Sequence, residues 1–208
     1  MKKLIGAARV RWLLAVALLG FGGALNAEED YVKIIYIRVG DEPPRIELKD
    51  DQGNLWKSSQ HFGKKYVVLY FYMGDFMKNC TQEAIAYRND YAAIVAQDAE
   101  VVGISGDAPA NHRMFKEKYQ LRQTLLSDAK GEVGKAFGSA WSGGGEWAVK
   151  DDAGKEVSLK RGVTESRWTW IIGKDGRVLY KNTNADPEQD SKQVLKFLTE
   201  LNARQQQP

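Results

Sequence analysis

The chain has 208 residues, of which 43% are hydrophobic and 27% are charged. This is ordinary globular composition for a chain of one core, so a single domain is expected. Residues 1–27 hold four of the 30 basic residues and no acidic residue, which leaves 26 basic against 27 acidic residues in the remainder. That balance excludes the basic surface that nucleic-acid binding requires, so no nucleic-acid partner is expected.

The first 27 residues have the pattern of a secretory signal peptide. Basic residues precede an apolar run at residues 12–25, and the small Ala27 is followed by three acidic residues. The apolar run of about 14 residues is shorter than the roughly 20 that span a bilayer. We therefore predict a cleaved signal peptide at residues 1–27, a periplasmic or secreted protein, and no membrane contact after cleavage. A retained anchor is the alternative.

The first half of the remaining chain alternates strand and helix patterns. Residues 45–49 and 54–57 flank a turn sequence and predict an N-terminal β-hairpin. Residues 66–72 are apolar and β-prone, which predicts a central strand buried on both faces. An amphipathic helix is predicted over residues 80–96 and a second buried strand over residues 100–105. Asp107 as N-cap and Pro109 in the first turn predict a helix that reaches Tyr119, and this order predicts parallel pairing of the strands.

The second half predicts another hairpin, from residues 168–172 and 177–181, and a last helix capped by Asp186-Pro187. Residues 139–165 are interpreted as a surface excursion, with a hairpin turn at 151–154 and glycines at 143–145 that give flexibility rather than a phosphate cradle. These elements predict an α/β fold with a mixed central sheet, helices on both faces and an N-terminal hairpin. The domain is expected at residues 39–202, after an extension at 28–38 and before a frayed tail at 203–208.

Cys80 is the only cysteine, and it lies at the start of the helix that follows the central strand. A helix N-terminus and nearby cations favour the thiolate, which is the nucleophilic form. One cysteine forms no internal disulfide, so Cys80 is either a reactive thiol or one that pairs with another molecule. A buried, unreactive thiol is the alternative. His61 and His112 form no ligand-spaced cluster, so we expect no metal site and interpret both as surface or hydrogen-bonded residues.

An ordered series of short motifs runs from about residue 39 to residue 201. It comprises Gly40-Asp41-x-x-Pro44, Val67-Val-Leu-Tyr-Phe-Tyr72, Cys80-Thr-x-Glu-Ala84, Val102-Gly-Ile-Ser105, Leu125-Leu-Ser-Asp128 and Arg167-x-Thr-x-Ile-Ile172. The series resembles the peroxiredoxins of the alkyl hydroperoxide reductase and thiol-specific antioxidant (AhpC/TSA) family, closest to the bacterioferritin-comigratory, or Q-type, branch. The resemblance implies a thioredoxin-like fold and a peroxidase that uses no cofactor.

The resemblance also implies roles for three residues. Cys80 attacks the peroxide as a thiolate and becomes a sulfenic acid, Arg167 stabilises the thiolate and positions the peroxide, and Glu83 orients the arginine. A depressed thiol pKa is expected. As isolated residues, Arg167 would be a surface ion-pair partner and Glu83 a charge at a helix N-terminus. Arg88 is either a second anchor or part of a solvated face.

Two departures from the family motif weaken this expectation. The family carries a proline and a threonine where this chain has Met73 and Met77, and methionine donates no hydrogen bond. Losing a hydrogen bond to a charged group costs about 1.5 to 3 kcal/mol, or roughly ten- to 150-fold in rate. Lys78 and Asn79 either compensate, by charge and by capping the helix, or face solvent.

The position of the resolving cysteine in the Q-type branch holds Ile85. A sulfenic acid at Cys80 therefore needs an external thiol, from a thioredoxin-like protein or a small molecule. The expected function is a one-cysteine peroxidase for hydrogen peroxide or alkyl hydroperoxides, acting as a monomer or weak homodimer. Two alternatives stay open: a non-catalytic interaction module that uses the tryptophan-rich residues 141–170, and a thiol-disulfide partner protein that forms mixed disulfides.

Overall fold

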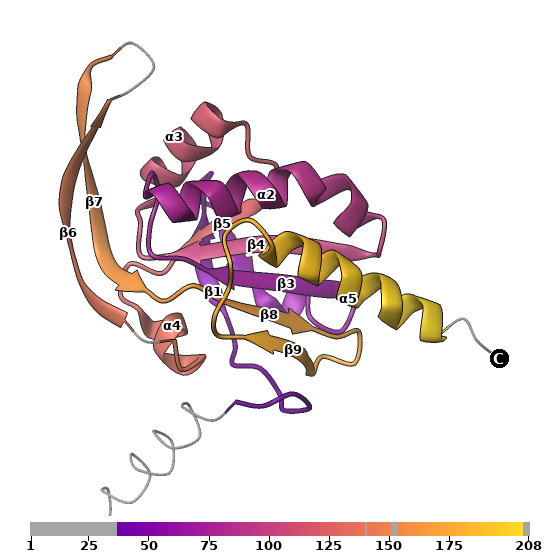
Figure 1. Ribbon diagram of the computed structural model, residues 1–208. Helices are drawn as coiled ribbons and strands as arrows, with labels where there is room; N and C mark the ends of the chain where they lie inside the picture. The colour runs from indigo at the N-terminus through magenta and orange to yellow at the C-terminus, as the bar shows by residue number, and fades with distance from the viewer. Residues whose placement is uncertain (1–36, 140, 151–153, 206–208) are drawn as a thin grey trace, which may run out of the picture.

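The computed structural model describes residues 37–139, 141–150 and 154–205. A seven-stranded sheet in the order β2-β1-β5-β4-β3-β8-β9 forms its centre, and a two-stranded ribbon of β6 (Trp141–Lys150) and β7 (Glu156–Glu165) stands beside it (Figure 1). The strands of the sheet are β1 Glu47–Asp50, β2 Leu55–Lys57, β3 Tyr66–Phe71, β4 Ala99–Ser105, β5 Thr124–Ser127, β8 Trp168–Ile172 and β9 Val178–Asn182. The helices are η1 Ser58–Gln60, α2 Lys78–Val95, α3 Pro109–Tyr119, α4 Glu132–Ala136 and α5 Asp190–Gln205.

The sheet is mixed, as predicted. β3 pairs with β4 and β4 with β5 in parallel, whereas β8 runs antiparallel to β3 and pairs with β9 in a hairpin. β1 and β2 form the N-terminal hairpin, and β1 joins the sheet beside β5. The predicted α/β fold is confirmed.

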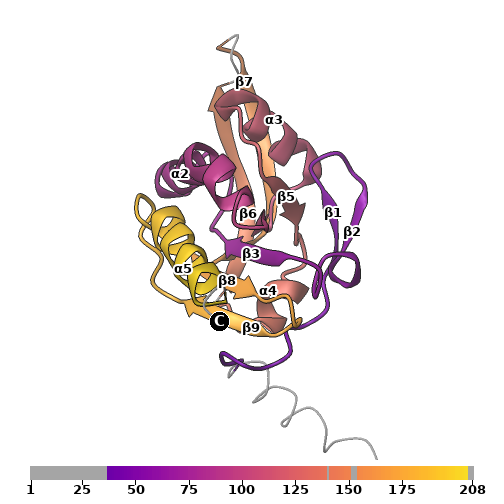
Figure 2. The same ribbon diagram turned by 90° about the vertical axis from the view of Figure 1, so that its right-hand side faces the viewer.

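β3 is buried at all six positions because helices cover both faces of the sheet. Val68 and Tyr70 pack in a cluster with residues of α2 and α5. Val67, Leu69 and Phe71 pack on the other side, in a cluster that includes Val133 of α4. Figure 2 shows α2 and α5 on one side of β3 and α4 on the other.

Residues 139–165 form a ribbon rather than a flexible excursion. β6 Trp141–Lys150 pairs antiparallel with β7 Glu156–Glu165, and the three glycines lie within β6. Alternate residues of β7 are buried, beginning with Leu159, so one face of the strand packs on the domain. Gly144 is required by the close approach of the strands, since a Cβ there would collide with the backbone of Arg161 and Gly162. The predicted turn lies mostly at residues 151–153, outside the described residues.

Three other predictions about element ends need correction or lie outside the structure. Ala108, not Asp107, is the N-cap residue of α3, because the Asp107 carboxylate accepts the amide of Asp75 instead. α5 continues to Gln205, so the frayed tail is wrong for residues 203–205. The signal peptide and nearly all of the predicted extension at 28–38 lie outside the described residues. No helix in the described part is long and apolar enough to cross a membrane.

Candidate active site around Cys80

Cys80 lies in the first turn of α2, at the end of the loop of residues 72–77 that follows β3, and is 1% exposed. Burial raises the pKa of the thiol to about 11, while backbone hydrogen bonds from Gly74 and Met73 and the charge of Arg167 act to lower it. The expected depressed thiol pKa is therefore wrong for this closed geometry, because the desolvation of the thiolate outweighs the groups that favour it.

Arg167 reaches the site through the pairing of two strands. Trp168 of β8 lies opposite Phe71 of β3, so the residue before Trp168 lies beside the loop that follows Phe71. Arg167 and Met73 line a pocket of about 480 Å³. One buried nitrogen of the Arg167 guanidinium has no hydrogen-bond partner among the described residues.

Glu83 follows Cys80 by three residues on α2, so both side chains lie on one face of the helix. Its side chain is fully buried, and neither carboxylate oxygen has a hydrogen-bond partner within the described ranges. Burial raises the pKa of Glu83 well above its ordinary value, Asp190 raises it further, and Arg167 lowers it. The fold thus places Glu83 on one face of α2 with Cys80 and Arg167 beside the loop that leads to Cys80, and the charges of both act on the pKa of the thiol.

The residues at and beside the departure from the family motif at Met77 lie at the start of α2. Met77 is the N-cap residue of α2, and no side-chain hydrogen bond caps that helix in the described structure. Lys78 and Asn79 are exposed, so the solvent-facing alternative holds for both. Arg88 donates to the carbonyl of Tyr119 at 2.8 Å, at the end of α3, and is not an anchor of the Cys80 site.

Arg161 of β7 also reaches this site, and no sequence motif marks it. Its side chain is buried, donates to the carbonyl oxygen of Met73 and has Nη1 3.2 Å from the sulfur of Met77. Nε lies 3.6 Å from Oδ2 of Asp107, and the guanidinium lies 4.1 Å from the ring centroid of Trp147. A side chain at residue 161 enters the site only because the ribbon folds back over the loop.

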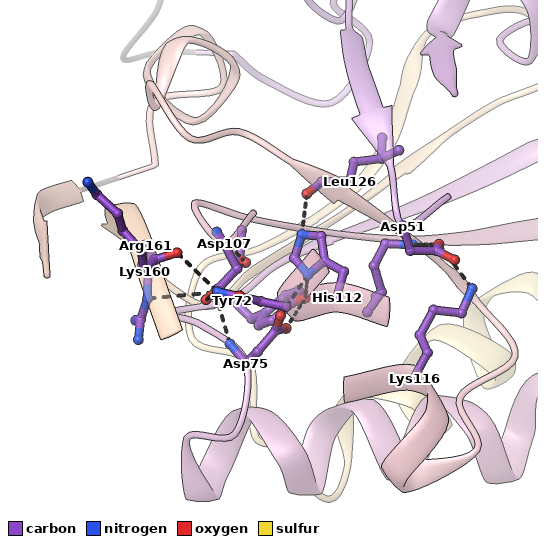
Figure 3. Close-up of polar contacts among 12 residues, drawn as sticks. Asp51, Tyr72, Asp75, Asp107, His112, Lys116, Leu126, Lys160 and Arg161 are labelled. Atoms are coloured by element: carbon purple, nitrogen blue, oxygen red, sulfur yellow. Dashed lines mark hydrogen bonds and ion pairs between the residues drawn. The ribbon is translucent and has the colours of Figure 1, made fainter. Parts of the chain in front are cut away.

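A buried polar network lies under the same loop (Figure 3). His112 Nδ1 is 2.8 Å from Asp75 Oδ2, and His112 Nε2 is 3.2 Å from the carbonyl oxygen of Leu126. Asp75 also accepts a hydrogen bond from Tyr72 at 2.8 Å, and its amide donates to Asp107 at 3.0 Å. Burial alone would lower the pKa of His112, but Asp75 and Asp107 raise it above its ordinary value.

Both histidines have hydrogen-bond partners, so the interpretation of them as hydrogen-bonded residues is confirmed. His112 is fully buried, while His61 is partly buried and lies 2.7 Å from Glu100. A signal for the network was present in the sequence, because Asp75 and Asp107 follow two neighbouring parallel strands whose carboxyl ends meet. In the described residues, no group of three or more His, Cys, Asp or Glu side chains could hold a metal ion.

Among the side chains that the structure describes, no exposed tryptophan-rich surface is found. Trp56 and Trp170 are buried, and Trp147 and Trp168 are half-buried against the domain. These four are the tryptophan side chains that the structure describes.

Comparison with known proteins identifies the family of the chain. The model of the AhpC/TSA family matches residues 39–181, so the chain belongs to that family. It is 37% identical to the chloroplastic peroxiredoxin Q of Populus jackii over 166 residues, which cover 79% of this chain and 70% of the relative. It is 36% identical to peroxiredoxin Bcp of Bacillus subtilis over 143 residues, which cover 69% and 83%.

Among solved structures, the peroxidoxin BcpB from Mycobacterium tuberculosis matches with a TM-score of 0.65 and 27% identity, over 80% of this chain and 99% of that chain. The protein is thus a peroxiredoxin, and its resemblance to the Q-type branch is confirmed. The predicted periplasmic or secreted location is wrong by these comparisons, because the peroxiredoxin Q relatives are chloroplastic. Residues 1–27, on which that prediction rested, lie outside the described residues.

Proposed function

We propose that the protein is a one-cysteine thiol peroxidase that reduces hydrogen peroxide or alkyl hydroperoxides at Cys80 and is restored by an external thiol. The observation that carries the proposal is the position of the only thiol of the chain, which lies in the first turn of α2, on one face with Glu83 and next to the loop beside Arg167. Membership of the family supplies the class of reaction.

In the first step, the Cys80 thiolate attacks one oxygen of the hydroperoxide. An S–O bond forms while the O–O bond breaks, and the departing alkoxide or hydroxide takes a proton to leave as an alcohol or water. The sulfur is oxidised to a sulfenic acid by two electrons. Arg167, always cationic, stabilises the thiolate and the charge that develops on the departing oxygen.

The pocket beside Arg167 is the proposed path for the peroxide. Hydroxyl and amide side chains, including Thr183 and Asn184, share its wall with Met73 and Arg167. Cys80 does not line this pocket and is buried. Because the sulfur is buried, the site must open before a hydroperoxide reaches it, and we expect small hydroperoxides to be reduced fastest.

In the second step, an external thiol attacks the sulfenic acid. The S–O bond breaks, water leaves, and a mixed disulfide forms between Cys80 and the reductant. A second external thiol then attacks that disulfide and releases the Cys80 thiol together with an oxidised disulfide. Ile85 occupies the position of a resolving cysteine, so both reducing thiols come from outside the chain.

The test is peroxide consumption by the purified protein with dithiothreitol or a thioredoxin system as reductant. Cys80→Ser should abolish consumption, whereas Lys78→Gln, an exposed neighbour, should not change it. Mass spectrometry with a dimedone trap should find the sulfenic acid on Cys80 after one equivalent of peroxide. Equal consumption by the wild type and Cys80→Ser would remove the proposal.

A further inference from the structure

We propose that Arg161 is a positioning residue for Cys80: from the β6–β7 ribbon it holds the peptide group between Met73 and Gly74 so that the Gly74 amide points at the thiol. The inference deepens the proposed function of the same site and rests on it, since a held thiol matters here because it reacts with peroxide.

The planarity of the peptide bond carries the argument. In a trans peptide, the carbonyl of one residue and the amide of the next point in opposite directions. The carbonyl of Met73 accepts a hydrogen bond from the Arg161 guanidinium. The amide of the same peptide group belongs to Gly74, and a backbone hydrogen bond from Gly74 acts to lower the pKa of Cys80. Arg161 and Cys80 therefore bind opposite ends of one peptide group.

This arrangement does two things for the sulfur. It fixes the direction of the Gly74 amide, and a cation on the carbonyl side polarises the peptide so that its N–H becomes a stronger donor. The backbone of Met73 forms a second hydrogen bond with Cys80. A proline at residue 73 would have no amide to donate. Met77 thus removes a hydroxyl donor from the family motif, whereas Met73, unlike a proline, keeps a backbone amide that can serve the thiol.

Arg161 is itself held on several sides. The Asp107 carboxylate lies 3.6 Å from Nε, and the Trp147 ring is 4.1 Å below the guanidinium. The guanidinium also lies directly against Gly74, where a Cβ would collide with it. Gly74 is therefore the residue that lets the cation approach the backbone this closely.

The network below the loop holds the next peptide group, between Gly74 and Asp75. Asp75 is fixed by His112 and Tyr72, and its amide is fixed by Asp107, which also faces Arg161. Both ring nitrogens of His112 face acceptors, which favours the imidazolium form. Two cations, one on α3 and one on β7, thus hold a loop between them.

The test measures the thiol directly, by the pH dependence of Cys80 alkylation with iodoacetamide, followed by mass spectrometry of the intact chain. Arg161→Gln should slow alkylation at pH 8 about ten- to a hundredfold, the effect of losing or misdirecting one hydrogen bond to a charged sulfur. Arg161→Lys, which keeps the charge without the fork, should recover part of the rate. Lys160→Gln is the matched control, because the neighbouring side chain is exposed on the other face of β7.

A second variant changes neither charged group. Gly74→Ala should displace the guanidinium and slow alkylation in the same direction while Arg161 is still present. The ionisable groups that face the thiol are Glu83 on α2, Tyr70 on β3 and Arg167 beside β8, and all three remain in every variant. Thermal unfolding by circular dichroism establishes that each variant is folded.

Folded Arg161→Gln protein that alkylates at the wild-type rate from pH 6 to pH 10 would overturn the inference. The outcome does not depend on peroxide turnover. If Cys80→Ser leaves peroxide consumption unchanged, the proposed function fails while the alkylation result still decides what Arg161 does. If turnover requires Cys80 but Arg161→Gln alkylates normally, the positioning role alone fails.

Discussion

Gly162 lies where β7 packs against the backbone at Gly106 and Ala129, and its substitution by alanine should loosen the ribbon. The amide of Gly162 donates to the carbonyl of Gly106 at 2.9 Å, and a Cβ at Gly162 would collide with the backbone carbonyl of Ala129. Backbone atoms on both sides cannot move aside as the end of a flexible side chain can. Gly145, paired with Arg161 across the ribbon, has no described atom within 4 Å of an added Cβ.

The expected cost of Gly162→Ala is that of overpacking, about 1 to 3 kcal/mol in the free energy of unfolding. For a chain of this size, this lowers the unfolding midpoint by roughly 2 to 12 °C. Gly145→Ala should instead stabilise the strand by up to about 1 kcal/mol, because glycine in a strand interior loses more conformational entropy than alanine.

Thermal unfolding of the two variants gives the stabilities, and hydrogen exchange gives the protection of the Gly162 amide. We expect Gly162→Ala to lose midpoint temperature and amide protection together, with Gly145→Ala at or above the wild type. If both variants unfold at the wild-type temperature and the amide stays protected, the close docking of β7 is not real.

Two further substitutions test the site itself. Arg167→Gln removes a cation that acts to lower the pKa of Cys80, and we expect kcat/KM for peroxide to fall about 100- to 1000-fold; a fall of less than threefold would contradict its role. Glu83→Gln should stabilise the fold at pH 8 by about 1 to 3 kcal/mol in chemical denaturation, because a neutral amide avoids the cost of burying an ionisable carboxyl whose two oxygens have no hydrogen-bond partner among the described residues. The folded pKa of Glu83 is raised, so its stabilising contribution is present at low pH and is lost as the pH rises through that pKa. The advantage of the variant should therefore shrink at pH 5, and an advantage that does not change with pH would refute this reasoning.

The sequence predicts the central sheet well because its signals are local. The apolar run of β3 and the turn between β8 and β9 each depend on a few neighbouring residues, and both are confirmed. The sequence does not predict the ribbon, because three adjacent glycines argue against a strand. Only the close approach of Arg161 and Gly162 explains why one of them, Gly144, is needed.

The site residues that lie in local motifs are predictable for the same reason, because each motif depends on a few neighbouring residues. Cys80 and Arg167 lie in motifs that the chain shares with its family, but Arg161 acts through a backbone carbonyl that no side-chain pattern reveals. Asp107 fits the pattern of a helix cap, yet its carboxylate has other partners in the amide of Asp75 and the hydroxyl of Ser105. A lone histidine such as His112 gives no signal until the fold supplies its acceptors.

The pairing of β3 with β8 has a consequence for how the chain folds. Val67 pairs with Ile172, so the strand that leads to Cys80 finds one of its partners only after most of the chain has been made. Pairings so distant in sequence close slowly, because a long loop must first be ordered. Until β8 docks, Arg167 is not beside the thiol, and we expect the thiol to be less completely covered than in the finished sheet. Since Cys80 is the only thiol and is 1% exposed once the sheet is complete, a brief pulse of a thiol reagent during refolding counts the molecules that have not yet closed.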